Sequence, residues 1–370
     1  MTKLRDICRF QSGGTPSRGT PAYFNGNVPW ITTVALNGDV IDGNQAIEWI
    51  TDEAIAKSAA KIVPPHSVMV GTRVGIGKVA INSVPMSTSQ DIISLIGIDE
   101  NKWDKKFICH LITANKEHLT SQARGATIKG IKIEAIADLV LPEISLKEQA
   151  RISEVIGKVD ALMHMHQQMA MNLEQLVKSR FIELFGVYPS NPKGWETATI
   201  RDIVADVRYG SSRPAVDGGK YPYLRMNNIT YGGELDLTDT KRIDIPDNEL
   251  DKCTVRRGDV LFNRTNSKEL VGKTCVYNRD EIMVLAGFVI RVRVTERVLP
   301  DFLSAFLNTD FSKQMLLGMC KAAIGQANIN AQEMQNIGIY LPPTELQRQF
   351  VQFKEQTDKS KLCGTMEVAA

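Results

Sequence analysis

The feature that most constrains this chain is an internal repeat with a period of about 200 residues, because such a repeat requires two structural units built on one plan. Leu141-Pro142 recurs as Leu341-Pro342, and Leu4-Arg5-Asp6-Ile7 recurs as Ile200-Arg201-Asp202-Ile203. The other matched segments, in chain order, are 13–17 with 210–214, 28–31 with 221–224, 71–80 with 263–275, and 125–128 with 325–328. Chance explains one such match, but a series in the same order indicates duplicated domains.

A long helix is predicted between the two copies. Ser145 and Glu148 form a capping-box pattern at its start, and Gly186 followed by Pro189 ends it. Side chains at alternating spacings of three and four form one stripe along this helix, as in a coiled coil. The stripe consists of Ile152, Val155, Val159, Leu162, His166, Met169, Leu173 and Leu176. About 40 residues at 1.5 Å each give a rod of roughly 60 Å, which suits a spacer that also docks a partner.

The chain therefore divides into four segments. They are a first domain (1–143), the long central helix (144–186), a second domain (187–342) and a short C-terminal helix (343–370). The last helix is expected to run from Thr344 to about Lys361, with a poor stripe and a tail that is not helical.

Each domain is predicted to be mixed α+β. Segments 28–31 and 221–224 look like edge strands, because each contains a proline. Helices are predicted at 105–114 in the first domain and at 300–317 in the second. The fold class is thus two similar α+β domains joined by long helices.

Composition excludes several classes of protein. Lys and Arg total 44 against 42 Asp and Glu, so bulk charge does not indicate a nucleic-acid binder. The six cysteines form no Cys-x-x-Cys pair, which argues against a zinc site or a disulfide framework. The charged N-terminal segment does not resemble a signal peptide, and no apolar run is long enough to cross a membrane. We expect a cytoplasmic protein with no membrane partner and no bound metal.

Catalytic motifs are also lacking. Gly272-Lys273-Thr274 resembles the end of a phosphate-binding loop, but Ser267 stands where the first glycine belongs. All five histidines precede residue 167, so the repeat duplicates no catalytic histidine. No set of nucleophile, base and orienting group is found, and we expect no catalytic residues.

The repeat instead duplicates recognition chemistry. Matching loops carry Arg and Lys, which contact phosphates or guanine edges, and Asn and Gln, which pair with adenine. The predicted DNA-binding residues are Thr15, Arg18, Asn27, Arg73, Lys78 and Gln90 in the first domain, and Arg213, Arg225, Asn228, Asn263, Arg264, Asn266 and Lys273 in the second.

With these residues assembled, the chain resembles the specificity (S) subunits of type I restriction-modification enzymes along its full length. The matching stretches are 13–18 (GGTPSR), 27–32 (NVPWIT), 71–81 (GTRVGIGKVAI), 141–152 (LPEISLKEQARI), 221–229 (YPYLRMNNI), 256–274 (RRGDVLFNRTNSKELVGKT) and 341–349 (LPPTELQRQ). The set is specific because the motifs recur in order in both halves.

The resemblance implies two target-recognition domains that each read one half of a bipartite, asymmetric site in double-stranded DNA, held apart by antiparallel coiled-coil helices. Those helices dock methyltransferase (M) subunits, which recruit restriction and translocase (R) subunits. The chain itself is expected to bind no cofactor, whereas its partners use S-adenosylmethionine, ATP and Mg²⁺.

Two other functions stay open from the residues alone. A coiled-coil assembly adaptor whose end domains bind proteins would capture partners without any DNA sequence preference. A nucleotide-dependent enzyme built on Gly272-Lys273-Thr274 would lose nucleotide binding on Lys273→Ala.

Overall fold

The computed structural model describes residues 1–38, 40–125, 129–323 and 326–369. Its internal contacts divide the chain into unit 1 (1–162) and unit 2 (163–370), which are described separately below. The boundary between the units falls inside the long central helix, and the four-segment division of the sequence stays a prediction. The repeated segments 125–128 and 325–328 lie partly outside the described residues.

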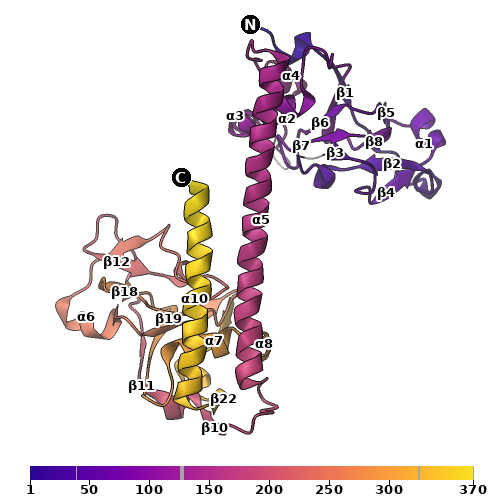
Figure 1. The fold of residues 1–370 in the computed structure, drawn as a ribbon. Coiled ribbons are helices and arrows are strands. Elements are labelled where there is room, and N and C mark those ends of the chain that lie inside the picture. Colours follow the sequence, from indigo (N-terminus) through magenta and orange to yellow (C-terminus); the bar gives the residue numbers. More distant parts are fainter. Residues whose placement is uncertain (39, 126–128, 324–325, 370) are drawn as a thin grey trace. The chain divides into compact units, whose positions relative to one another are not determined.

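Unit 1 contains two mixed sheets (Figure 1). The first has the order β1-β9-β6-β7-β3, with β1 (Arg9–Ser12), β9 (Ile92–Ile96), β6 (Val68–Gly71), β7 (Val79–Asn82) and β3 (Val40–Ile41). The second has the order β4-β2-β8-β5, with β4 (Glu48–Ile50), β2 (Val28–Ile31), β8 (Met86–Thr88) and β5 (Ile62–Val63). Both sheets contribute buried aliphatic side chains to the cores of this unit.

Short helices cover the first sheet of unit 1. Helix α2 begins after Asp104, whose carboxylate accepts from the backbone N–H of Phe107, and its buried face includes Ile108 and Ile112. The predicted helix at 105–114 is therefore confirmed. The helical elements of the unit are η1 (Leu4–Asp6), η2 (Pro21–Phe24), η3 (Thr33–Ala35), α1 (Asp52–Lys57), α2 (Lys105–Ala114), α3 (Lys116–Ser121) and α4 (Ile133–Ala137).

Unit 2 repeats this plan. One sheet has the order β11-β19-β15-β17, with β11 (Val204–Tyr209), β19 (Val289–Val294), β15 (Val260–Asn263) and β17 (Thr274–Val276). A second has the order β13-β12-β18-β14, with β13 (Lys241–Ile243), β12 (Tyr221–Leu224), β18 (Met283–Leu285) and β14 (Thr254–Val255). The smaller sheets are β10 (Glu196–Thr199) with β22 (Gly338–Leu341), and β16 (Thr265–Asn266) with β21 (Gln326–Asn328) and β20 (Lys321–Ala323). The two larger sheets match those of unit 1 strand for strand, apart from β3.

The predicted helix at 300–317 is wrong in one respect, because the structure divides it into α7 (Pro300–Asn308) and α8 (Asp310–Met319). Thr309 has an extended backbone between them, and its hydroxyl accepts from the N–H of Ser312 to cap α8. The other helical elements of this unit are η4 (Ile200–Ile203), η5 (Met226–Asn228), α6 (Asp247–Cys253) and α9 (Ala331–Gln335).

The expectation that 28–31 and 221–224 are edge strands is also wrong. β2 lies between β4 and β8, and β12 lies between β13 and β18. Pro29 is tolerated because β8 pairs only with Trp30 and Ile31, so the missing amide hydrogen is not needed on that side. Pro222 is accommodated in the same way, since β18 pairs only with the two residues after it.

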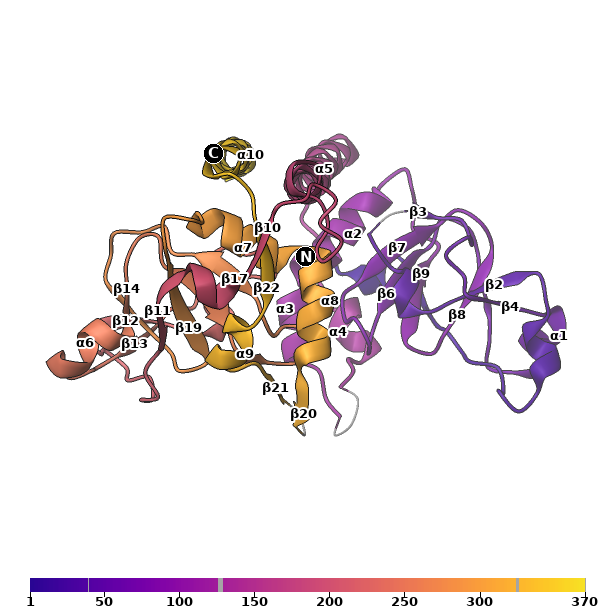
Figure 2. The same cartoon turned by 90° about the horizontal axis from the view of Figure 1, so that it is seen from below.

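The central helix is α5 (Leu146–Phe185), unbroken through residues 152–176, and the C-terminal helix is α10 (Thr344–Ala369). In unit 2, Phe350 of α10 packs edge-on against Phe181 of α5, and Lys361 pairs with Glu174. The later residue on α10 thus meets the earlier one on α5, so the two helices run antiparallel there (Figure 1). Figure 2 shows the two helices end-on.

Helix α10 extends beyond Lys361, where the sequence led us to expect it to end. The tail contains Leu, Met, Glu and Ala, which favour helix, so a helix already formed propagates into it despite Gly364.

Candidate nucleic-acid interface

Three of the predicted arginines of unit 2 line one hollow of about 540 Å³. Arg213 lies on the loop after β11, Arg225 follows the last residue of β12, and Arg264 lies between β15 and β16. The half-exposed ring of Phe288, in the turn between β18 and β19, also lines it. Loops from both large sheets therefore bring together cations that are far apart in the sequence.

Two of these arginines have carboxylate partners. Arg213 forms two hydrogen bonds with Glu249, at 3.2 and 2.7 Å, and this contact lowers the pKa of the Glu249 carboxyl. Arg225 donates to the carboxylate of Asp239 at 2.9 Å and to its backbone oxygen at 3.0 Å. Both guanidiniums are held in place, and part of their charge is neutralised.

Arg264 differs from the other two. Its guanidinium lies 5.0 Å from the centre of the Tyr209 ring, and it donates to the side-chain oxygen of Asn328 at 3.0 Å. Among the described residues, no carboxylate forms an ion pair with Arg264 within 4.0 Å. Tyr209, Phe288 and Asn328 were not predicted as site residues, although the last belongs to a repeated segment that could have drawn attention to it.

Three other predicted residues are turned into the protein. Asn228 is buried, and its amide accepts from the N–H of Arg225 while donating to the carbonyls of Asp236 and Asp239. Asn263 is also buried, and Lys273 donates from its ammonium to the carbonyl of Met226 at 2.9 Å. In the structure described, these side chains are buried and hydrogen-bonded within the loops.

Burial of Lys273 lowers the pKa of its ammonium group. The side chain is only 7% exposed, so it does not project into a phosphate-binding loop. Thr274, next to it, begins a strand where a phosphate-binding loop would begin a helix. The remaining predicted amide, Asn266, is half-buried and accepts from the N–H of Ser267.

In unit 1 the predicted residues are more dispersed. Arg18 forms a two-point ion pair with Glu48 and lies over the rings of Phe24 and Trp30, at 4.5 and 5.4 Å. The other residues predicted in this unit are half-buried Thr15 and exposed Asn27, Lys78 and Gln90.

Arg73 of unit 1 lines a separate, open hollow of about 1010 Å³ together with Arg124 and Lys132. Its guanidinium lies 3.5 Å from the carboxylate of Asp91. Arg124 and Lys132 were not predicted, because neither has a cationic counterpart in the second copy that would have marked it.

The predicted partner-docking stripe of α5 is partly exposed. Val155, Val159, Leu162, Met169 and Leu176 are 42 to 54% exposed, whereas Ile152, His166 and Leu173 are half-buried. Isolated exposed apolar side chains are ordinary, but a row of them along one helix indicates an interaction surface.

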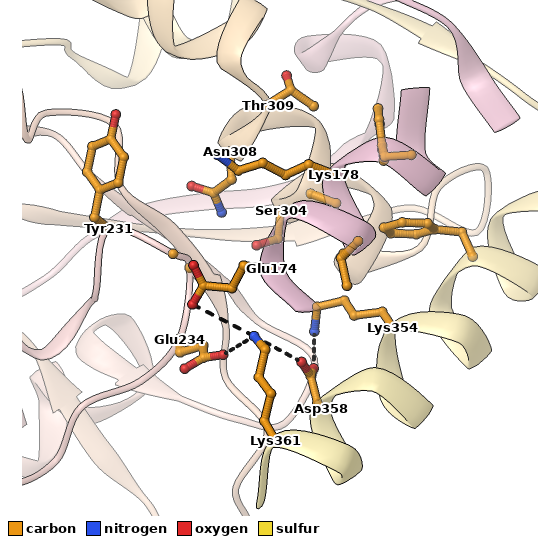
Figure 3. Close-up of a pocket in the computed structure, with 16 residues that line it drawn as sticks. Glu174, Lys178, Tyr231, Glu234, Ser304, Asn308, Thr309, Lys354, Asp358 and Lys361 are labelled. Carbon is orange, nitrogen blue, oxygen red and sulfur yellow. Dashed lines mark hydrogen bonds and ion pairs between the residues drawn. The ribbon is translucent and has the colours of Figure 1, made fainter. Parts of the chain in front are cut away.

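A second hollow of unit 2, of about 240 Å³, lies where α5, α7 and α10 meet the loop 231–234 (Figure 3). Its apolar wall includes Phe181 and Phe350, and Lys361 at its rim lies 3.2 Å from the carboxylate of Glu234 and 3.8 Å from that of Glu174. Figure 3 shows the Lys361 ammonium with these two carboxylates on one side and that of Asp358, 3.7 Å away, on the other, so one cation links the loop 231–234 with both long helices.

Within the described ranges, no helix is long and apolar enough to span a bilayer. Over those same residues, no three or more His, Cys, Asp or Glu side chains are arranged to hold a metal ion.

Comparison with known proteins gives consistent matches. A family model described as the type I restriction modification DNA specificity domain matches residues 1–175 and 192–363. The specificity subunit of type I restriction enzyme MjaIX from Methanocaldococcus jannaschii is 27% identical over 259 residues, covering 65% of this chain and 60% of that protein. The EcoKI specificity subunit of Escherichia coli K12 is 24% identical over 323 residues, covering 82% of this chain and 69% of that protein.

Two solved structures share the fold. The S subunit of the type I restriction-modification system of M. genitalium matches all of this chain and 91% of that chain, with a TM-score of 0.56 at 14% identity. A chain from a study of complex assembly and conformational transition of the type I R-M system matches all of this chain and 93% of that chain, with a TM-score of 0.59 at 17% identity. Because the family model covers both copies of the repeat, the chain belongs to the family of type I restriction-modification DNA specificity domains.

Proposed function

We propose that this chain is the sequence-reading subunit of a type I restriction-modification complex and binds a bipartite, asymmetric site in double-stranded DNA. The observation that carries the proposal is the convergence of Arg213, Arg225 and Arg264 on one hollow of unit 2. In protein–DNA complexes, guanidinium groups contact phosphates and guanine edges. The second unit repeats the sheet plan with different loop side chains, so each unit would read its own half-site.

The chain would act without catalysing a reaction itself. Methyltransferase subunits would dock on the apolar stripe of α5, and restriction and translocase subunits would join through them. S-adenosylmethionine, ATP and Mg²⁺ would be used by those partners. The net charge of this chain is only +2. Because binding to DNA phosphates depends on many cations, partner subunits would supply part of that binding. The cytoplasmic location stays a prediction.

The experiment that tests this function is a selection from random duplexes, performed with the chain assembled with its cognate methyltransferase. The expected product is a two-part motif with an unspecific spacer of constant length. Capture of methyltransferase with no enriched sequence would contradict the proposal and favour an assembly adaptor.

A further inference from the structure

The two units can be aligned residue by residue through their backbone hydrogen bonds. The carbonyl of Ile31 accepts from the N–H of Ser89 at 2.9 Å, and that of Leu224 accepts from Ala286 at 2.8 Å. Ile31 is the last residue of β2, which pairs in parallel with β8, and Leu224 is the last residue of β12, which pairs in parallel with β18. The next residues, Thr32 and Arg225, therefore correspond. Each has nearly the same backbone angles and lies just before a short 3₁₀ helix.

A second pair of positions is fixed in the same way. The N–H of Thr72 donates to Asp91 and its carbonyl accepts from Ile131, both at 2.8 Å. The N–H of Arg264 donates to Phe288 at 3.0 Å and its carbonyl accepts from Ile329 at 2.9 Å. Thr72 is therefore the counterpart of Arg264. Arg73, one residue further on, corresponds to Thr265 and lines a different hollow, in unit 1.

We propose that Arg264 reads a guanine in the half-site bound by unit 2, and that unit 1 makes no such contact at the corresponding point. This inference rests on the proposed function and names a base that one domain recognises. An arginine donates two parallel hydrogen bonds to O6 and N7 of guanine in the major groove, the most common specific contact to that base. A threonine lacks this two-point geometry.

Arg264 is better suited to this role than its two neighbours in the hollow. Arg213 and Arg225 already donate to Glu249 and Asp239, whereas the described residues give Arg264 no carboxylate partner. The Nε atom of Arg264 is buried without a hydrogen-bond partner. One terminal nitrogen donates to the carbonyl of Gly287 at 3.5 Å and the other to Asn328 at 3.0 Å, so each keeps a second N–H for a ligand.

The Arg264 side chain is also held in position before any DNA is bound. The Tyr209 ring lies 5.0 Å from its guanidinium, and the amide oxygen of Asn328 accepts from one terminal nitrogen at 3.0 Å. Such preorganisation reduces the entropy lost when the side chain contacts a base. Asn328 is accordingly a positioning residue for this contact.

Unit 1 lacks the equivalent chemistry. Thr72 is buried, and its hydroxyl donates to the carbonyl of Asp91 at 3.1 Å. Thr32 takes the place of Arg225, so the two arginine positions aligned here, 225 and 264, are both threonine in unit 1. The half-site of unit 1 must be read by other side chains.

The test is a selection from random duplexes with the intact chain and its cognate methyltransferase, repeated with Arg264→Gln and Arg264→Lys. Replacing Phe288, which lines the same hollow, with a photo-crosslinking phenylalanine analogue identifies the half-site that unit 2 contacts. We expect Arg264→Gln to lower the preference for guanine at one position of that half-site by about 5- to 150-fold. The other half of the motif should not change.

The conservative variant Arg264→Lys distinguishes recognition of guanine from general electrostatic attraction to DNA. Arg264→Lys keeps the cation but loses the two-point fork, so it should retain the salt dependence of binding and lose most of the guanine preference. Asn328→Ala should weaken the same preference to a lesser extent. Arg257→Gln, which removes a cation paired with Asp280 away from the hollow, is the matched control. Thermal melting of each variant shows whether unit 2 is folded.

The outcomes distinguish the two proposals. A bipartite motif whose unit 2 half contains no guanine, or whose guanine preference survives Arg264→Gln in a folded complex, overturns the inference and leaves the proposed function intact. If the wild-type complex selects no motif, the proposed function fails with it.

Discussion

The hydroxyl of Tyr223 lies 3.1 Å from the carbonyl oxygen of Ser211 and donates to it from the middle of its sheet. In unit 1 the indole N–H of Trp30 donates to the carbonyl of Gly14, also at 3.1 Å. The two aromatic residues occupy the same position on β12 and β2. Each forms a hydrogen bond to the loop that follows strand β11 or β1 of its unit. Different side chains in the two copies thus make one structural contact, and this contact holds the loop that carries Arg213.

Tyr223→Phe tests how much this hydrogen bond contributes to stability. The substitution removes the hydroxyl that contacts the carbonyls of Ser211 and Arg213, while the N–H of Gly287 still donates to Ser211 at 2.7 Å. We therefore expect the free energy of unfolding of unit 2 to fall by about 0.5 to 1.5 kcal/mol, as for a typical hydrogen bond. Urea denaturation followed by tryptophan fluorescence measures the change. Tyr231→Phe is the control, because that tyrosine is exposed and should tolerate the loss of its hydroxyl. Equal stability of the two variants would show that the contact contributes nothing.

A second repeated contact involves Gln149 and Gln347, both of which are buried. The amide of Gln149 accepts from the N–H of Asp104 at 3.0 Å and donates to the carbonyl of Lys102. That of Gln347 accepts from the N–H of Leu299 at 2.8 Å and donates to two other carbonyls. Each glutamine ties the start of a long helix to the domain before it.

Replacing either glutamine with alanine should destabilise its own unit by about 1 to 3 kcal/mol, since buried backbone groups lose their partners. The matched controls are Gln167→Ala on α5 and Gln352→Ala on α10, which are exposed. Hydrogen exchange followed by mass spectrometry would locate the effect. Faster exchange confined to unit 1 for Gln149→Ala, and to unit 2 for Gln347→Ala, is expected, and a uniform change in both units would contradict it.

The repeat made much of the fold predictable, because strand order depends on the order of segments and their pattern. Burial of single polar residues was not predictable in the same way. Asn228 and Lys273 lie in loops rich in polar residues, yet they face inward to satisfy backbone groups that the turns leave without partners. Their partners are distant in sequence, so no local pattern reveals them.

Two other predictions depended on exact structural position. Arg73 and Arg264 lie in matching loops, but the backbone partners of Arg264 match those of Thr72, so the two arginines are one residue out of register. Proline in strand β2 or β12 suggested an edge, but whether a missing amide hydrogen matters depends on how far the neighbouring strand extends. That length is set by tertiary structure, which the sequence of one strand does not contain.

Leu162→Glu tests the stripe of α5 as a docking surface. Leu162 is 54% exposed, so the substitution should leave the thermal stability of the chain nearly unchanged. Burying a charge against an apolar partner surface is costly, and we expect capture of the cognate methyltransferase in a pull-down to weaken at least about tenfold.

The control for this substitution is Met171→Glu, which adds the same charge to the opposite side of the same helix, at a residue that is 56% exposed. It should bind methyltransferase as the unmodified chain does. Equal loss of binding in both variants would indicate a general effect of charge and would contradict docking on the stripe.

Lys313 gives a pH-dependent prediction. Burial, together with the nearby charges of Lys178 and Lys273, lowers the pKa of its ammonium from the ordinary 10.5 to about 7. Between these two values the unfolded chain binds a proton that the folded chain does not, so this group makes stability rise with pH. Below pH 7 both states are charged and the cost of burying the ammonium is fully present.

Lys313→Met removes that cost. We expect the variant to be more stable than the unmodified chain below about pH 7, with the difference shrinking as the pH approaches 10.5. The loss of the hydrogen bond from Lys313 to the carbonyl of Gly272, 2.9 Å long, remains at every pH and sets the residual difference. Lys313→Arg is the control, because arginine stays charged throughout this range and should give no such gain. Urea titrations at the two ends of the range measure both variants, and a gain from Lys313→Met that does not change with pH would mean that the ammonium is not desolvated.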